Sequence, residues 1–191
     1  MHRDCYDDFV VRVGERIAGL RPGPPLDPAS DTGAIVSRQQ LDKVLSYIEI
    51  GKSEQARLVT GGERLTEGDL AAGNFISPAL FADVDPAGRL ATEEIFGPVL
   101  AAIPFADYDE AVAIANSVEY GLTASVFTRD LRTAMAFSRD VEAGYVWVNE
   151  TSRHYLGAPF GGVKNSGVGR EEDLEEIESY TQLKSVNIRF G

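Results

Sequence analysis

The sequence predicts an α/β protein built on a largely parallel sheet with helices on both faces. Three short apolar stretches, at residues 99–105, 122–128 and 145–148, have the length and composition of strands. Two amphipathic segments, at 108–117 and 131–141, lie between them and have helical spacing. An alternation of strands and helices implies right-handed crossovers, which place the strands in parallel and cover the sheet on both sides. At 191 residues with 43% hydrophobic residues, the chain is long enough for one sizeable core.

A first helix is predicted at residues 5–18, because apolar residues recur there at helical spacing and Asp4 can cap the start. Gly19 fits its end. The following segment, 21–31, contains four prolines and a glycine, which exclude regular structure. We interpret it as a loop within one domain, because a single short helix before it cannot bury its apolar face alone.

A second helix is predicted to begin at Ser37, which forms a capping box with Gln40, and to stop at Gly51. Its apolar stripe consists of Leu41, Val44, Leu45 and Ile48. Two further strands are predicted after it, at 57–60 and 75–81.

The end of the chain has a different pattern. Residues 171–178 are acidic and helical, and residues 182–190 alternate well enough for a strand that has no obvious partner nearby. Because a lone strand tends to pair with another sheet edge, this pattern predicts a homo-oligomer.

Composition and charge exclude several classes of function. The net charge of -12 leaves no basic surface for nucleic acid. Cys5 is the single cysteine and fits a reducing compartment, while the scattered histidines give no metal-ligand spacing. No apolar run approaches the ~20 residues needed to span a membrane, and residues 1–10 are too charged for a signal peptide. We therefore expect a cytoplasmic protein with no metal and no membrane partner.

Two motifs could carry chemistry. In residues 93–98 (EEIFGP), a glutamate could accept hydrogen bonds from both hydroxyls of a ribose, and Phe96 could pack against a nicotinamide. Alternatively, the two acidic residues only open a buried strand. The second motif, 159–171 (PFGGVKNSGVGRE), has four glycines that suggest close backbone approach. It lacks the spacing of a phosphate-binding loop, so a structural loop is the alternative.

Four segments together resemble the NAD(P)-dependent aldehyde dehydrogenases: 93–100 (EEIFGPVL), 120–130 (YGLTASVFTRD), 144–149 (GYVWVN) and 159–171. The resemblance covers residues 3 to about 187. It implies an aldehyde dehydrogenase-like catalytic domain, with residues 1–181 as its portion and residues 182–191 as an oligomerisation strand and tail.

The resemblance also implies roles for single residues. Glu94 matches the glutamate that holds the nicotinamide ribose, Phe96 matches the aromatic residue beside it, and Phe160 matches a residue that lines the aldehyde tunnel. The glycines of 159–171, Lys164 and Arg170 match structural positions.

Between these motifs lies the loop 150–158, which in related enzymes covers the mouth of the substrate tunnel. Ser152, Arg153 and His154 could therefore bias the choice of aldehyde, or could be solvated loop residues. Ser152 and His154 form no catalytic triad, because no G-x-S-x-G turn is present.

The resemblance also shows what this chain lacks. In the family, the nucleophilic cysteine, the general-base glutamate and the dinucleotide fold precede the segment that residue 3 begins to match. Cys5 lacks the Gly-Gln-x-Cys-type context of the reactive thiol, so no catalytic residue is predicted.

We therefore expect a truncated aldehyde dehydrogenase that is inactive alone and binds NAD or NADP weakly or not at all. The alternative is a non-catalytic assembly or regulatory module that docks on full-length subunits through residues 182–190. The sequence selects neither the aldehyde nor one of the two cofactors.

Overall fold

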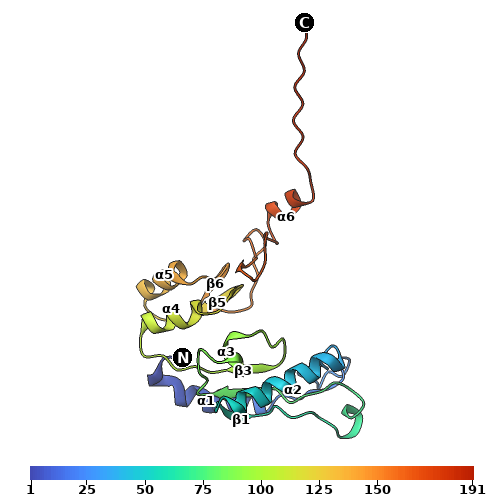
Figure 1. Cartoon of the computed structure of the whole chain (residues 1–191), viewed down its shortest axis with the longest axis vertical. Helices are drawn as coiled ribbons and strands as arrows, with labels where there is room; N and C mark the ends of the chain where they lie inside the picture. The colour runs from blue at the N-terminus through green and yellow to red at the C-terminus, as the bar shows by residue number, and fades with distance from the viewer. The chain divides into compact units, whose positions relative to one another are not determined.

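A computed structural model describes all residues from 1 to 191, and the chain forms two compact units, Met1–Ile114 and Ala115–Gly191 (Figure 1).

The first unit consists of a three-stranded sheet with one long helix on each face. The sheet has the order β1 (Arg57–Thr60), β2 (Ala79–Ala82), β3 (Val99–Ala101), with β1 antiparallel and β3 parallel to β2. The two long helices are α1 (Arg3–Ala18) and α2 (Arg38–Ser53). Two short helical segments complete the unit, η1 (Gly68–Leu70) and α3 (Arg89–Thr92).

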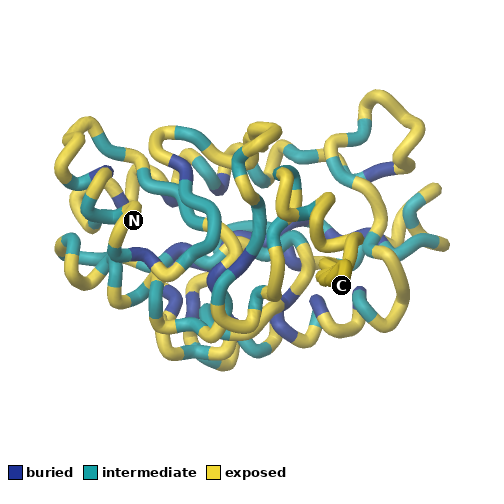
Figure 2. Tube along the Cα trace, turned by 90° about the horizontal axis from the view of Figure 1, so that it is seen from above, coloured by how far each residue is buried: buried dark blue, intermediate teal, exposed yellow.

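The central strand β2 explains this layering, because all four of its residues are buried. Ala79 and Phe81 belong to the core cluster of α2, whereas Leu80 and Ala82 belong to the cluster of α1. Successive strand residues point to opposite faces, so β2 alone joins the two cores. Buried positions are the dark blue stretches of the trace in Figure 2.

The second unit contains a parallel strand pair joined by a crossover helix. β5 (Thr123–Val126) pairs in parallel with β6 (Tyr145–Val148), and α5 (Leu131–Asp140) connects them. The side chain of Asp130 caps α5 by accepting hydrogen bonds from Arg132 N and Thr133 N. The remaining elements are α4 (Tyr108–Asn116), which contains the boundary between the units, β4 (Tyr120–Gly121), β7 (Val163–Lys164) and α6 (Leu174–Ser179); β4 and β7 pair antiparallel.

The α/β class is confirmed, and most predicted elements are present. The sheet arrangement differs from the prediction, because β3 pairs only with β2 and β5 only with β6, so that the strands form separate small sheets. The sheet of the first unit is also mixed, since β1 runs antiparallel to β2.

Two predicted helix ends were wrong. His2 caps α1 instead of Asp4, because the helix begins earlier and Nδ1 of His2 accepts a hydrogen bond from the backbone N–H of Asp4. Gly51 lies inside α2, which continues to Ser53. A Cβ at Gly51 would lie 2.9 Å from the ring of Phe81, so this glycine permits close packing and does not end the helix.

Within the single chain, residues 182–190 form no strand. A strand requires a neighbour for its backbone hydrogen bonds, and this segment has none within the chain. The assembly role of this segment stays a prediction. No helix has both the length and the apolar character that a membrane crossing requires.

Candidate functional site

Glu93 is anchored by α2 and α3. Its carboxylate accepts hydrogen bonds from Nε and Nη2 of Arg89, at 2.8 and 2.9 Å, and from the hydroxyl of Tyr47, at 2.5 Å. The Arg89 hydrogen bonds, followed by that of Tyr47, lower the pKa of Glu93 to about 2. The same contact raises the pKa of Tyr47, because ionisation of the phenol would remove the proton that Glu93 accepts. Glu93 therefore serves as a structural anchor.

Glu94 differs from its neighbour in every contact. Its side chain is exposed, and its carboxylate has no hydrogen bond or ion pair, while its carbonyl oxygen accepts a hydrogen bond from Nζ of Lys43 at 2.8 Å. Of the two adjacent carboxylates, Glu94 is thus the one that is available to a ligand.

Phe96 projects from the same loop and is 75% exposed, on a backbone with φ of 55°. Nε2 of Gln40 donates hydrogen bonds to the carbonyls of Ile95 and Phe96, at 2.8 and 3.0 Å. Gly97 packs so closely on Val44 that a Cβ would overlap it. The loop of residues 94–97 is therefore held against the N-terminal half of α2.

Sequence reasoning missed Gln40 and Lys43 as residues that hold this loop. It assigned Gln40 to the capping box, and half of that prediction is confirmed, since Oγ of Ser37 accepts a hydrogen bond from Gln40 N at 3.1 Å. The amide of Gln40 points instead to a loop 55 residues away. A usable signal was the spacing of Gln40 and Lys43, which places both on one side of the helix.

In the second unit, four aromatic rings gather where the residues after β6 return to that strand. The ring of His154 lies 4.5 Å from that of Phe160 and 6.0 Å from that of Tyr145, with an angle of 18° between the His154 and Tyr145 planes. Trp147 completes the group, 4.8 Å from Tyr145 and 6.1 Å from His154 between ring centroids. Two of the predicted tunnel residues, His154 and Phe160, are thus in direct contact.

The loop 149–158 is fixed to β6 by a hydrogen bond from Nε1 of Trp147 to the carbonyl of Arg153, at 2.7 Å. The guanidinium of Arg153 lies 3.7 Å from the carboxylate of Glu150 and 5.1 Å from the centroid of the Tyr155 ring. The charge of Arg153 is therefore partly compensated within the loop. Ser152 is exposed, with φ of 59°.

Glu172 is the third residue that sequence reasoning missed. Its Oε1 lies 2.6 Å from Nδ1 of His154, and its Oε2 is buried without a hydrogen-bond partner. The sequence gave no signal for this pair, because 18 residues separate its members and Glu172 lies in a run of acidic residues.

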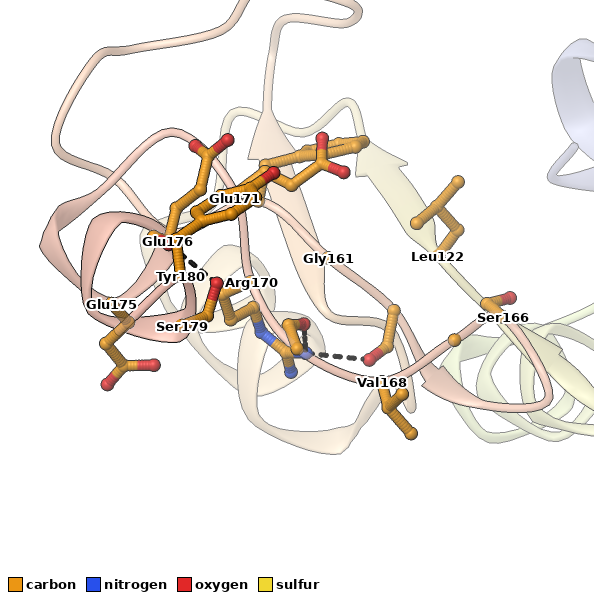
Figure 3. Close-up of a pocket in the computed structure, with 14 residues that line it drawn as sticks. Leu122, Gly161, Ser166, Val168, Arg170, Glu171, Glu175, Glu176, Ser179 and Tyr180 are labelled. Atoms are coloured by element: carbon orange, nitrogen blue, oxygen red, sulfur yellow. Dashed lines mark hydrogen bonds between the residues drawn. The ribbon is translucent and has the colours of Figure 1, made fainter. Parts of the chain in front are cut away.

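The glycine-rich segment borders a cavity of about 580 Å³, shown in Figure 3. Nη1 of Arg170 donates to the carbonyls of Gly162 and Gly169, at 2.9 and 2.7 Å, which are the dashed contacts of Arg170 in that view. Nζ of Lys164 donates to the carbonyls of Asn116 and Val118, at 2.8 and 3.0 Å. Both cations hold backbone, which supports structural roles, and three carboxylates line the cavity: Glu171, Glu175 and Glu176.

Cys5 lies in the first turn of α1, and its thiol donates to the carbonyl of His2 at 3.3 Å. The hydrogen-bond partner of this thiol is a backbone carbonyl and not a general base, so the structure gives no support for a nucleophile at this position. No group of three or more histidine, cysteine and acidic side chains is placed to hold a metal ion.

Comparison with known proteins places these features in context. Residues 1–186 match the model of the aldehyde dehydrogenase family. Aldehyde dehydrogenase tropH from Talaromyces stipitatus is 45% identical over 195 residues, and the match includes all of this chain and 38% of that protein. The chain thus spans well under half the length of this curated relative.

Solved structures give the same result. A putative aldehyde dehydrogenase from Burkholderia cenocepacia superposes with a TM-score of 0.91 at 38% identity, over 95% of this chain and 37% of that one. The Mycobacterium tuberculosis aldehyde dehydrogenase complexed with NAD+ has a TM-score of 0.90 at 44% identity, over 100% of this chain and 39% of that one. A betaine aldehyde dehydrogenase from Staphylococcus aureus, also in complex with NAD+, has a TM-score of 0.90 at 32% identity, over 94% and 36% of the two chains.

Proposed function

Because this chain belongs to the aldehyde dehydrogenase family, we propose that it supplies part of the site of an oxidoreductase that converts an aldehyde to a carboxylic acid with NAD or NADP. The family chemistry consists of thiolate attack on the aldehyde, hydride transfer to the nicotinamide and hydrolysis of the thioester. This chain contributes the nicotinamide ribose contact and one wall of the substrate tunnel.

The observation that carries this proposal is the contrast between Glu93 and Glu94. The resemblance assigns the ribose to the second glutamate, and the structure leaves that carboxylate unpartnered while it locks the first one. Glu94 would accept hydrogen bonds from the ribose hydroxyls, and the exposed ring of Phe96 would pack against the nicotinamide. When bound, NAD or NADP supplies the hydride acceptor of the reaction.

The proposed tunnel wall consists of Phe160, Ser152, Arg153 and His154. The contact of His154 with Phe160 supports their common assignment to one surface, because the two rings pack together. Because Arg153 is partly paired with Glu150, its electrostatic attraction for an anionic aldehyde is weaker. His154 is therefore the stronger candidate for recognition of the substrate.

We propose further that the chain is inactive by itself. Cys5 has neither the sequence context nor the neighbours of a reactive thiol, and no other cysteine is present. The test is to incubate the purified 191-residue chain with NAD or NADP and a panel of aldehydes and to follow absorbance of the reduced cofactor. We expect no aldehyde-dependent signal; turnover that disappears in Cys5→Ala would overturn this part of the proposal.

A second candidate is an assembly module that docks on full-length dehydrogenase subunits. The observation that favours it is the segment 182–190, where Leu183, Val186, Ile188 and Phe190 are exposed and the backbone has no partner. Co-purification with a full-length homologue, lost on deletion of residues 182–191, would support this role. A chain that never associates with such a homologue would exclude it.

A further inference from the structure

We propose that Glu172 is a positioning residue that fixes His154 with its proton on Nδ1, so that Nε2 is a hydrogen-bond acceptor that selects planar aldehydes bearing a hydroxyl group. This inference deepens the proposed function and rests on it, because it assumes that His154 and Phe160 line the substrate tunnel.

The first step concerns the tautomer of His154. A neutral imidazole carries one proton, and the ring nitrogen that faces an acceptor keeps it. Nδ1 lies 2.6 Å from Oε1 of Glu172, a carboxylate oxygen that can only accept. In the neutral ring this contact places the proton on Nδ1, and the lone pair of Nε2 has no hydrogen-bond partner within the protein.

The second step concerns Glu172, whose backbone is fixed by hydrogen bonds and whose carboxylate contacts His154. Its backbone N–H donates to Glu176 Oε2 at 2.8 Å, its carbonyl accepts from the N–H of Gly157 at 2.8 Å, and φ is 68°. Its Oε2 is buried and unpaired, so the hydrogen bond from His154 to Oε1 is the one hydrogen bond that this carboxylate accepts. Loss of that bond would leave both oxygens without a donor.

The third step concerns the surroundings of the ring. Phe160 and Tyr145 pack against His154, and the adjoining backbone at Arg153 is fixed by Trp147. The ring plane of His154 lies at 18° to that of Tyr145 and at 37° to that of Phe160, and these aromatic neighbours favour a planar aromatic substrate, which can stack on them or pack edge to face. A hydroxyl group on that substrate would donate to Nε2, whereas an ether or a plain ring has no proton to donate.

The chain contains a built-in reference for the tautomer, because it has two histidines. Nδ1 of His2 accepts a hydrogen bond from the N–H of Asp4 at 3.2 Å, so the neutral ring of His2 carries its proton on Nε2. The two rings are thus expected to show opposite tautomers in one spectrum.

The first experiment is a long-range proton–nitrogen correlation spectrum of the uniformly 15N-labelled chain at about pH 8.5, with His2→Gln for assignment. We expect the protonated nitrogen of His154 to be Nδ1. In Glu172→Leu, which keeps a side chain of similar length without an acceptor, His154 should shift to the Nε2–H form. The matched control Glu175→Gln removes a nearby carboxylate that makes no contact with His154 and should leave the tautomer unchanged.

A wild-type His154 that carries its proton on Nε2, or on both nitrogens at this pH, would overturn the proposal whether or not Glu172→Leu folds. The proposal would also be overturned if His154 had the same tautomer in the wild type and in folded Glu172→Leu.

The second experiment tests the substrate class with two methyl ketones that cannot be oxidised as aldehydes, 4-hydroxyacetophenone and 4-methoxyacetophenone. We expect the hydroxy compound alone to shift the Nε2 resonance of His154, and Glu172→Leu to abolish the difference. Equal shifts from both compounds, or no shift from either, would overturn the substrate class. Neither spectrum requires turnover. A negative result would therefore count against the role of Glu172 and His154 without counting against the proposed dehydrogenase function.

Discussion

Of the two neighbouring residues Glu93 and Glu94, the first uses its carboxylate for structural hydrogen bonds and the second has a carboxylate without a partner. Arg89 and Tyr47 neutralise and orient Glu93, so the loop after α3 is fixed at its first residue. Lys43 and Gln40 then hold the carbonyls of Glu94, Ile95 and Phe96. With its backbone fixed on both sides, Glu94 presents its carboxylate from a rigid support.

This arrangement predicts a pH-dependent contribution of Glu93 to stability. Its pKa is about 2 in the folded chain, below its ordinary value, so its contribution is fully present above about pH 4.5 and is lost as the pH falls toward 2. Glu93→Gln should therefore lower the melting temperature at pH 7, and the gap to wild type should narrow with acidification below pH 4.5. Thermal denaturation between pH 7 and 3.5 measures this gap.

The matched control is Glu94→Gln, which removes the adjacent carboxylate and should leave the melting temperature at pH 7 unchanged. A gap between wild type and Glu93→Gln that stays constant down to pH 3.5 would contradict the assignment.

Gln40 offers a second residue-level prediction. Gln40→Ala removes the donor to two backbone carbonyls, and we expect unfolding to become easier by about 1 to 2 kcal/mol. Gln39→Ala is the control, because Gln39 is exposed on the same helix turn without a hydrogen bond. Chemical denaturation of both variants measures the difference, and equal stability would show that the loop does not depend on Gln40.

At the scale of elements, periodicity predicted the helices and the strand positions well, while helix ends depended on contacts that local patterns do not contain. Gly51 looked like a terminator because glycine commonly follows a helix, yet its absent side chain makes room for Phe81 and Leu90. Asp4 looked like a cap, but His2 occupies that position. The contact between His154 and Glu172 joins two loops, and local sequence patterns did not predict it either.

Packing at Gly51 gives a prediction with a definite sign. Alanine normally stabilises a helix by about 1 kcal/mol relative to glycine. At Gly51 its Cβ would lie 2.9 Å from Phe81, a ring with no exposed surface, and 3.0 Å from Leu90 Cδ2. Overpacking costs about 1 to 3 kcal/mol, so we expect Gly51→Ala to be destabilising overall.

The comparator is Gly14→Ala in α1, where the nearest atom to a Cβ is the methyl group Val59 Cγ1 at 3.1 Å. The denaturation midpoint of Gly51→Ala should lie below that of the wild type. The midpoint of Gly14→Ala should change less than that of Gly51→Ala. The reverse order would show that Phe81 can move.

At the scale of the whole molecule, the family and the fold class could be predicted because four motifs occur in order along the chain, and similarity over residues 1–186 confirms the family. The arrangement of the strands into separate small sheets could not be predicted, since pairing partners depend on tertiary contacts. The strand expected at 182–190 stays a prediction, because alternation describes which residues could pair and the single chain offers this segment no neighbouring strand.

The exposed segment 182–190 predicts self-association of the purified chain. Its four large apolar side chains lie in solvent, and its backbone groups are unpaired. Light scattering after size exclusion at micromolar concentration should give a mass above that of the 20.7 kDa monomer. Serine at Leu183, Val186, Ile188 and Phe190 should lower the association state while keeping the chain length; a strictly monomeric wild type would contradict this expectation.

Whether this chain supplies a working part of a dehydrogenase site can be tested by replacing the matching 39% of the Mycobacterium tuberculosis aldehyde dehydrogenase with residues 1–191. We expect the chimera to reduce NAD+ when an aldehyde is added, and Glu94→Gln in the chimera to raise the KM for NAD+ about tenfold, since one charge-assisted hydrogen-bonding group is lost. A folded chimera that forms no reduced cofactor, or one whose KM is unchanged by Glu94→Gln, would contradict the role proposed for this chain.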